Sequence, residues 1–210
     1  VDAGRTVVVY NPDTRRLDVQ PGTGDDTVDS VCAGRVNVRV TDADTVSNPD
    51  LALDVSLVSS EPGAVDVTVA ITNRSAAPVR IAGIDVVDGV TPFGPGDQAF
   101  VHGYQSWTPT ATLQLDEFFP SEDAANRPQM VDLAAPVDAR TSHAVTALTG
   151  DPGRLTLAFM DHDAFLPRFD LRTDADTGQT ALTAVCPLDD VALEPGERRE
   201  AATLRVDVGR

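Results

Sequence analysis

The sequence predicts an all-β fold, an antiparallel β-sandwich. Apolar and polar residues alternate with a period of two over 35–42, 51–58 and 65–72, which is the pattern of half-buried strands. Turn residues separate such runs roughly every ten residues, and no segment repeats its apolar residues with the period of a helix. This spacing favours a sandwich over alternating strand–helix units. Without a repeat or a low-complexity linker, we expect one domain over 1–210.

Six further strands are expected, four of them in two hairpins. The turn GDPG separates one pair, and DTGQ separates the other; both are typical hairpin signals. The turn NRSAAP precedes a fifth strand, and the Pro-Gly turn in LEPGERRE precedes the last one. The strands are 78–88, 142–149, 154–160, 169–175, 180–188 and 202–208.

One long segment, 115–140, breaks the strand pattern. It contains three prolines and shows no alternation, which predicts an irregular connection with at most one helical turn, starting at Ser121. Long loops in compact domains are often functional. The segment follows HGYQSWTPT (102–110), and we expect the two to form one exposed face that docks another domain.

The charge is strongly negative. Thirty-three acidic residues face sixteen basic ones, all of them Arg, so the formal charge is −17. Such a surface repels phosphates, which argues against nucleic acid and anionic membranes as partners. The acids are spread along the whole chain, which favours adaptation to high salt, where repulsion is screened. No run of 18 apolar residues is present, so no membrane-spanning helix is expected.

The two cysteines, Cys32 and Cys186, lie in strand-like segments far apart in sequence. They are either two buried free thiols or a disulfide that joins the two segments. No leader peptide is recognisable at the start, which together with cysteines that look unpaired favours a cytoplasmic location.

Motifs for catalysis and metal binding are missing. His102, His143 and His162 are not spaced as zinc ligands, and no nucleophile elbow, P-loop or dinucleotide fingerprint occurs. The triplet DHD (161–163) is unremarkable in a chain this rich in Asp. DADTG (174–178) has its Gly one position too early for a calcium loop, so a hairpin turn is the better interpretation. We assign no catalytic residue, metal or cofactor.

The stretch HGYQSWTPT concentrates aromatic residues in a chain that has few. It holds the only Trp, Trp107, and one of two Tyr residues, Tyr104. One interpretation is that they fill a core, where Trp is usually well buried. The other is a loop facing a sugar or a protein, since its small and polar residues are poor core formers. The candidate site residues are His102, Gly103, Tyr104, Gln105, Ser106 and Trp107.

The run Gly103–Trp107 resembles the "NGYQSWS" segment of family 36 glycoside hydrolases, the melibiase-type α-galactosidases, with His102 in place of Asn and Thr108 in place of Ser. The resemblance implies an N-terminal β-sandwich that precedes a catalytic (β/α)₈ barrel, to which both catalytic Asp residues belong. It implies an α-galactoside substrate, and it suggests a homo-oligomer. It places Trp107 in the wall of the galactose subsite, with Tyr104 and Gln105 supporting the loop.

A second function remains open. A sandwich of this kind could also be a free-standing carbohydrate-binding or adhesion-type module, because sandwiches host both roles. The two hypotheses differ in whether a barrel follows the domain.

Overall fold

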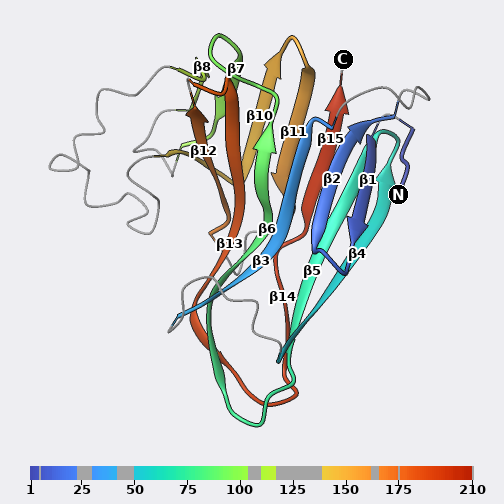
Figure 1. The fold of residues 1–210 in the computed structure, drawn as a ribbon, viewed down its shortest axis with the longest axis vertical. Coiled ribbons are helices and arrows are strands. Elements are labelled where there is room, and N and C mark those ends of the chain that lie inside the picture. The colour runs from blue at the N-terminus through green and yellow to red at the C-terminus, as the bar shows by residue number, and fades with distance from the viewer. Residues whose placement is uncertain are drawn as a thin grey trace, which may run out of the picture.

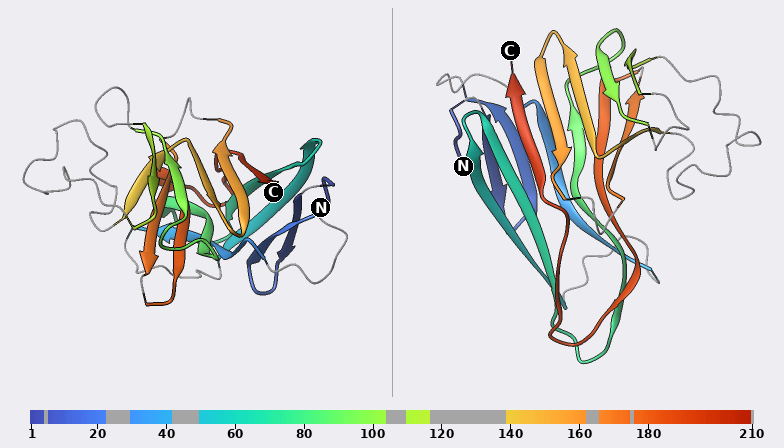
Figure 2. Two further views of the ribbon diagram at one scale, coloured as in Figure 1. Left: turned by 90° about the horizontal axis from the view of Figure 1, so that it is seen from above. Right: turned by 180° about the vertical axis from the view of Figure 1, so that it is seen from behind.

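A computed structural model describes residues 1–4, 6–22, 30–41, 50–103, 110–116, 139–161, 166–174 and 176–209. This part of the chain forms two antiparallel sheets that pack as a sandwich, and it contains no helix (Figure 1). Seen from above, the sheets form two layers (Figure 2, left). The predicted fold class is therefore confirmed. Within the same residues, no helix is long and apolar enough to cross a membrane.

The first sheet has seven strands in the order β1-β2-β3-β6-β13-β12-β9. The long strands β6 and β13 pair with each other near the centre of this sheet, and β3 pairs with the other edge of β6. The bounds are β1 Thr6–Asn11, β2 Arg16–Pro21, β3 Cys32–Val40, β6 Val79–Thr91, β13 Gln179–Leu193, β12 Arg168–Asp174 and β9 Arg140–His143.

The second sheet has eight strands. The order β14-β5-β15-β11-β10-β7-β8 describes seven of them, and the eighth, β4, pairs with β5. The bounds are β4 Leu51–Glu61, β5 Ala64–Asn73, β7 Gln98–Val101, β8 Ala111–Gln114, β10 Val145–Gly150, β11 Gly153–Phe159, β14 Arg198–Glu200 and β15 Leu204–Gly209.

The core lies between the two sheets and follows the predicted alternation. In β5, Val65, Val67, Val69 and Ile71 are fully buried, because every second side chain of a strand points to the same face. Burying one such side chain contributes about 1.5–3 kcal/mol. The rings of Phe159 and Phe169 stack with centroids 5.1 Å apart and join β11 of one sheet to β12 of the other.

Both predicted hairpins are present. Gly150 pairs with Gly153 across GDPG, and Asp174 pairs with Gln179 across DTGQ. In the second turn, Asp174 Oδ1 accepts hydrogen bonds from the backbone N–H groups of Asp176 (2.8 Å) and Thr177 (3.2 Å). Gly178 takes a left-handed φ of 66°. DADTG is thus a hairpin turn, as the sequence indicates.

Six strands were not predicted from the alternation: β1, β2, β7, β8, β9 and β14. The predicted single strand 142–149 is wrong, because the chain turns at Ala144 and the segment is divided between β9 and β10 in different sheets. The three Val residues of β1 follow one another without a polar residue between them, so no period of two is visible. The strands β7 and β8 have four residues each and β14 has three, which is too short to show a period. The predicted helical turn at Ser121 lies outside the described residues.

The cysteines are free thiols, so the disulfide interpretation is wrong. Cys32 lies in β3 and Cys186 in β13, and β6 separates these strands. Both side chains are buried. Burial raises the pKa of Cys32 to about 12 and that of Cys186 to about 11, so both stay protonated and unreactive.

Candidate functional site

The stretch HGYQSWTPT connects the paired strands β7 and β8, whose last register pair before the loop is Val101 with Ala111. It is therefore the loop of a β-hairpin in the eight-stranded sheet. Of the candidate residues, His102 and Gly103 are described, whereas Tyr104, Gln105, Ser106 and Trp107 lie outside the described residues. Whether Trp107 fills a core or faces a ligand stays a prediction.

Hydrogen bonds close the two ends of this loop against each other. The Thr110 hydroxyl accepts from the Gly103 N–H at 3.2 Å and lies 3.1 Å from His102 Nδ1. The His102 side chain is exposed, while Gly103 is buried. His102 thus has a partner within the loop base, a role that the sequence did not reveal.

Ser142 of β9 ties the loop base to the other sheet. Its fully buried hydroxyl accepts from the His102 N–H at 2.7 Å and donates to the Val145 carbonyl at 2.6 Å. The His143 N–H donates to the His102 carbonyl at 2.8 Å. At Ala144, which has a positive φ of 61°, the chain passes from β9 in one sheet to β10 in the other. The loop base is therefore a joint between both sheets.

The ends of the long connection lie at the same place. Strand β8 ends at Gln114 and β9 begins at Arg140, and Arg140 Nη1 donates to the Gln114 carbonyl at 2.7 Å. The strands β7, β8 and β12 lie on one side of the sandwich (Figure 1). Residues 117–138 lie outside the described residues. The exposed face expected from 102–110 and 115–140 therefore stays a prediction, although Gln114 and Arg140, at the two ends of the long connection, are in contact.

A buried ion pair lies next to this joint. Arg168 and Asp170 of β12 are 3.2 Å apart (Nε to Oδ2), and both side chains are at most 3% exposed. The Thr141 hydroxyl of β9 donates to Asp170 Oδ1 at 2.9 Å. Because Phe169 and Leu171 point into the core, Arg168 and Asp170 lie on the outward face of the seven-stranded sheet. Of the DHD triplet only Asp161, which is exposed, is described.

Further along that face, Asp85 of β6 is a second buried carboxylate. Burial raises its pKa to about 6, the Arg39 guanidinium opposes this rise, and the carboxylates of Asp88 and Asp170 add to it. Arg39 Nε donates to Asp85 Oδ2 at 3.0 Å. Among the residues that the structure describes, no group of three or more His, Cys, Asp or Glu side chains could hold a metal ion.

Comparisons with known proteins agree with this architecture. No protein-family model and no curated protein matches the chain. A GH36 α-galactosidase, AgaB from Geobacillus stearothermophilus, matches 97% of the chain with a TM-score of 0.54 and 10% identity. The galactosidase domain of an α-galactosidase–sucrose kinase, AgaSK, matches 98% with a TM-score of 0.52 and 10% identity. A putative aldose 1-epimerase from Escherichia coli matches 97% of the chain and 68% of its own length at 15% identity, but its TM-score is only 0.46.

At these identities the matches show a common fold and nothing finer. The chain spans 41% of the length of AgaB and 25% of that of AgaSK. It therefore shares its sandwich with a part of each α-galactosidase structure.

Proposed function

We propose that the chain is a non-catalytic N-terminal domain of an α-galactosidase, with all of 1–210 forming this one domain. The proposal rests on two independent findings that point to the same family. The fold matches part of AgaB over 97% of the chain, and the run that resembles the melibiase segment, Gly103–Trp107, falls in a hairpin loop with a fastened base.

The role of the loop follows from its chemistry. An indole packs well on the apolar face of galactose, while Gln105 and Ser106 can hydrogen-bond its hydroxyls. The hydrogen bonds of Thr110 and Ser142 hold the base of the loop, so less conformational entropy is lost when the loop contacts a sugar. The barrel would perform retaining hydrolysis of terminal α-galactosides through a covalent intermediate, and this domain would support the barrel and wall the sugar site.

The remaining assignments belong to the same proposal. The proposed partners are the C-terminal barrel of the same protein, the α-galactoside and further copies of the chain. The mass in solution tests the last of these. A cytoplasmic location is supported by two buried free thiols, since disulfides are rare there. A salt-adapted origin is supported by the formal charge of −17.

The test is Trp107→Ala in the full-length enzyme, assayed on an aryl α-galactoside. Loss of a stacked aromatic contact is worth roughly 1–3 kcal/mol by analogy with bases on aromatic side chains, so kcat/KM should fall about 5- to 150-fold. Thr112→Ala, an exposed position on β8 of the same hairpin, is the matched control and should leave kcat/KM unchanged.

Two results would contradict the proposal. If Trp107 fills a core, the substitution should instead lower the free energy of unfolding by about 3–5 kcal/mol, with an unchanged kcat/KM in the folded enzyme. A coding sequence in which no barrel follows this domain would favour the free-standing carbohydrate-binding or adhesion-type sandwich.

A further inference from the structure

The outward face of the seven-stranded sheet carries an open groove of about 450 Å³, in the size range of roughly 300–1,000 Å³ that is typical of ligand sites. It lies over β2, β3 and β6 and is distinct from the loop between β7 and β8. The residues that line it are Thr14, Arg16, Ala33, Gly34, Arg35, Asp88 and Val90.

The groove is built on a row of polar residues that oppose one another across the strands. Arg16 pairs with Arg35, Arg35 with Asp88, and Asp88 with Thr183. These side chains point outward, because Val36 and Val87, the neighbours of Arg35 and Asp88 in sequence, are buried in the core. Small residues and one partly exposed valine, Val90, form the remaining wall.

Neutral donors on both sides fix the carboxylate of Asp88. Asn37 Nδ2 donates to Asp88 Oδ2 at 3.1 Å, and the Thr183 hydroxyl donates to Oδ1 at 3.1 Å. Each carboxylate oxygen can accept about two hydrogen bonds, so each can take one more from a ligand. The side chain is exposed and is thus an oriented acceptor for two adjacent hydroxyl groups.

The two arginines differ in their availability. Arg16 is engaged, since its Nε lies 2.9 Å from Asp18 Oδ2. Arg35 is exposed and forms no ion pair with any residue in the described ranges, although Asp88 is its direct cross-strand partner. Its guanidinium can therefore donate to a ligand oxygen beside the carboxylate.

These groups favour a neutral polyol over an anion. An anion would meet the Asp88 carboxylate and the field of a chain with a formal charge of −17. A sugar instead offers hydroxyl donors to Asp88, hydroxyl or ring oxygens to Arg35, and C–H groups to Val90. We propose that this groove binds a neutral saccharide unit through a pair of adjacent hydroxyls, as a second carbohydrate site apart from the 102–110 loop.

The test is titration of the ¹⁵N-labelled 210-residue chain with methyl α-D-galactopyranoside and with raffinose. Amide shifts are expected at Gly34, Gly89 and Val90, with a Kd on the order of 1–10 mM because none of the lining residues in the described part of the chain is aromatic. Asp88→Asn and Arg35→Gln should each weaken binding about tenfold. Asp54→Asn removes an exposed carboxylate on β4 of the other sheet and should leave binding unchanged.

Several outcomes would overturn the proposal. These are the absence of shifts in the groove, binding by Asp88→Asn or Arg35→Gln that is as strong as that of the wild type, and glucuronate binding more tightly than the galactoside. Trp107→Ala should leave the groove shifts unchanged, so the groove and the proposed role of the loop succeed or fail separately. The spectra of the variants also report whether each one is folded.

Discussion

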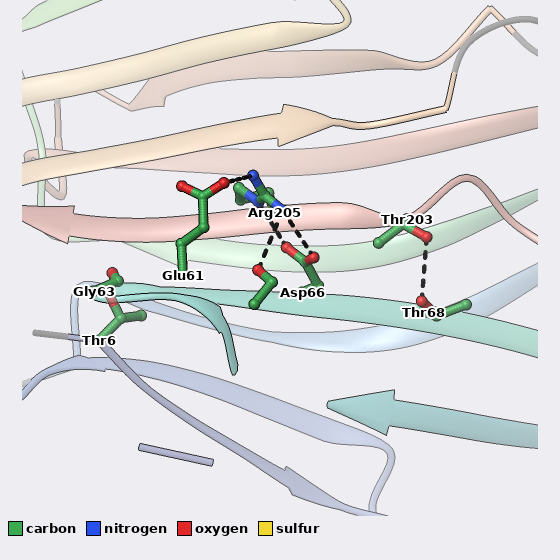
Figure 3. A network of polar contacts seen from close by, with 8 residues as sticks. Thr6, Glu61, Gly63, Asp66, Thr68, Thr203 and Arg205 are labelled. Carbon is green, nitrogen blue, oxygen red and sulfur yellow. Dashed lines mark hydrogen bonds and ion pairs between the residues drawn. The ribbon is translucent and has the colours of Figure 1, made fainter. Parts of the chain in front are cut away.

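Arg205 of β15 and Asp66 of β5 are cross-strand partners on neighbouring strands of the eight-stranded sheet. Their side chains form two parallel hydrogen bonds, Nε to Oδ1 at 2.8 Å and Nη2 to Oδ2 at 3.0 Å (Figure 3). The same guanidinium donates to Glu61 Oε1 at 2.9 Å and to the Ser60 hydroxyl at 3.2 Å. One side chain thus links β15 to β5 and to the end of β4. Arg205 lowers the pKa of Asp66.

Arg205→Gln should lower the free energy of unfolding at pH 7 by about 1–2 kcal/mol, because a bidentate, partly buried pair is stronger than an exposed one. A lowered pKa means that the contribution of Asp66 is present above its unfolded value of 3.8 and is lost as the pH falls through the folded value. The difference in free energy of unfolding between the wild type and Arg205→Gln, measured by urea denaturation, should therefore be smaller at about pH 3 than at pH 7. Arg198→Gln, half exposed, is the control and should cost under ~0.5 kcal/mol. Equal costs would contradict this ranking.

Asp85 should have the opposite effect on stability. Its pKa is raised from 3.8 to about 6, chiefly by burial. The folded state therefore holds the proton more tightly, and the contribution of Asp85 to stability is full below pH 3.8 and is lost as the pH rises through 6. Asp85→Asn should raise the free energy of unfolding at pH 7 by about 1–3 kcal/mol and flatten its pH dependence between pH 4 and 6.

Thermal unfolding across that pH range measures the effect of Asp85→Asn. Arg39 loses its partner in the variant, but its side chain is 36% exposed and can be hydrated. Asp54→Asn, at a side chain that is 77% exposed, should leave the profile unchanged. A loss of stability at pH 7 in Asp85→Asn would show that the ion pair outweighs the burial of the carboxylate.

The fold was predictable where each strand is long and has one face in the core. In β5 the alternation from Val65 to Val69 is regular, and it identifies the strand and its buried face; only Ala70, apolar and buried between Val69 and Ile71, departs from it. The continuous valines of β1 and the three residues of β14 carry no such signal. Close approach of strands is also invisible in sequence. A Cβ at Gly89 would collide with the Ala33 carbonyl oxygen, and this close approach is fixed only by the β3–β6 pairing.

The candidate site was predictable only in part. Composition identifies the 102–110 stretch, because its aromatic residues differ from the rest of the chain. Ser142 and Thr110 carry no such signal, since both are common residue types, and Ser142 meets His102 only because the chain changes sheets at Ala144. The groove partners Arg35 and Asp88 likewise come together through strand register alone.

Salt should stabilise the chain strongly. With a formal charge of −17, repulsion in the folded state is screened as the Debye length falls from about 10 Å at 0.1 M to about 3 Å at 1 M. The melting temperature should rise steeply at low KCl and then level off, whereas exclusion of salt from the surface would give a rise that continues with concentration. Differential scanning calorimetry between 0.1 and 2 M KCl measures this. A constant melting temperature would exclude adaptation to salt.

Ser142→Ala should loosen the base of the loop. The substitution removes the fully buried Ser142 hydroxyl and leaves the His102 N–H and the Val145 carbonyl, both partly buried, without this partner, so the free energy of unfolding should fall by about 1–3 kcal/mol. Thr112→Ala, exposed on β8, should change it by less than ~0.5 kcal/mol. Urea denaturation of the chain measures both.

Enzyme kinetics of Ser142→Ala can distinguish a role of Ser142 in holding the loop at the sugar site from a role in stability alone. If Ser142 acts on the sugar site through the loop, Ser142→Ala should lower kcat/KM of the full-length enzyme on an aryl α-galactoside under conditions where the enzyme stays folded. In a Trp107→Ala background it should then have little further effect on kcat/KM, because both changes remove the same contact. The loss of unfolding free energy should persist in that background. Fully additive losses in kcat/KM would mean that Ser142 does not act through Trp107, and the fastened loop base would then be only a structural joint between β9 and β7.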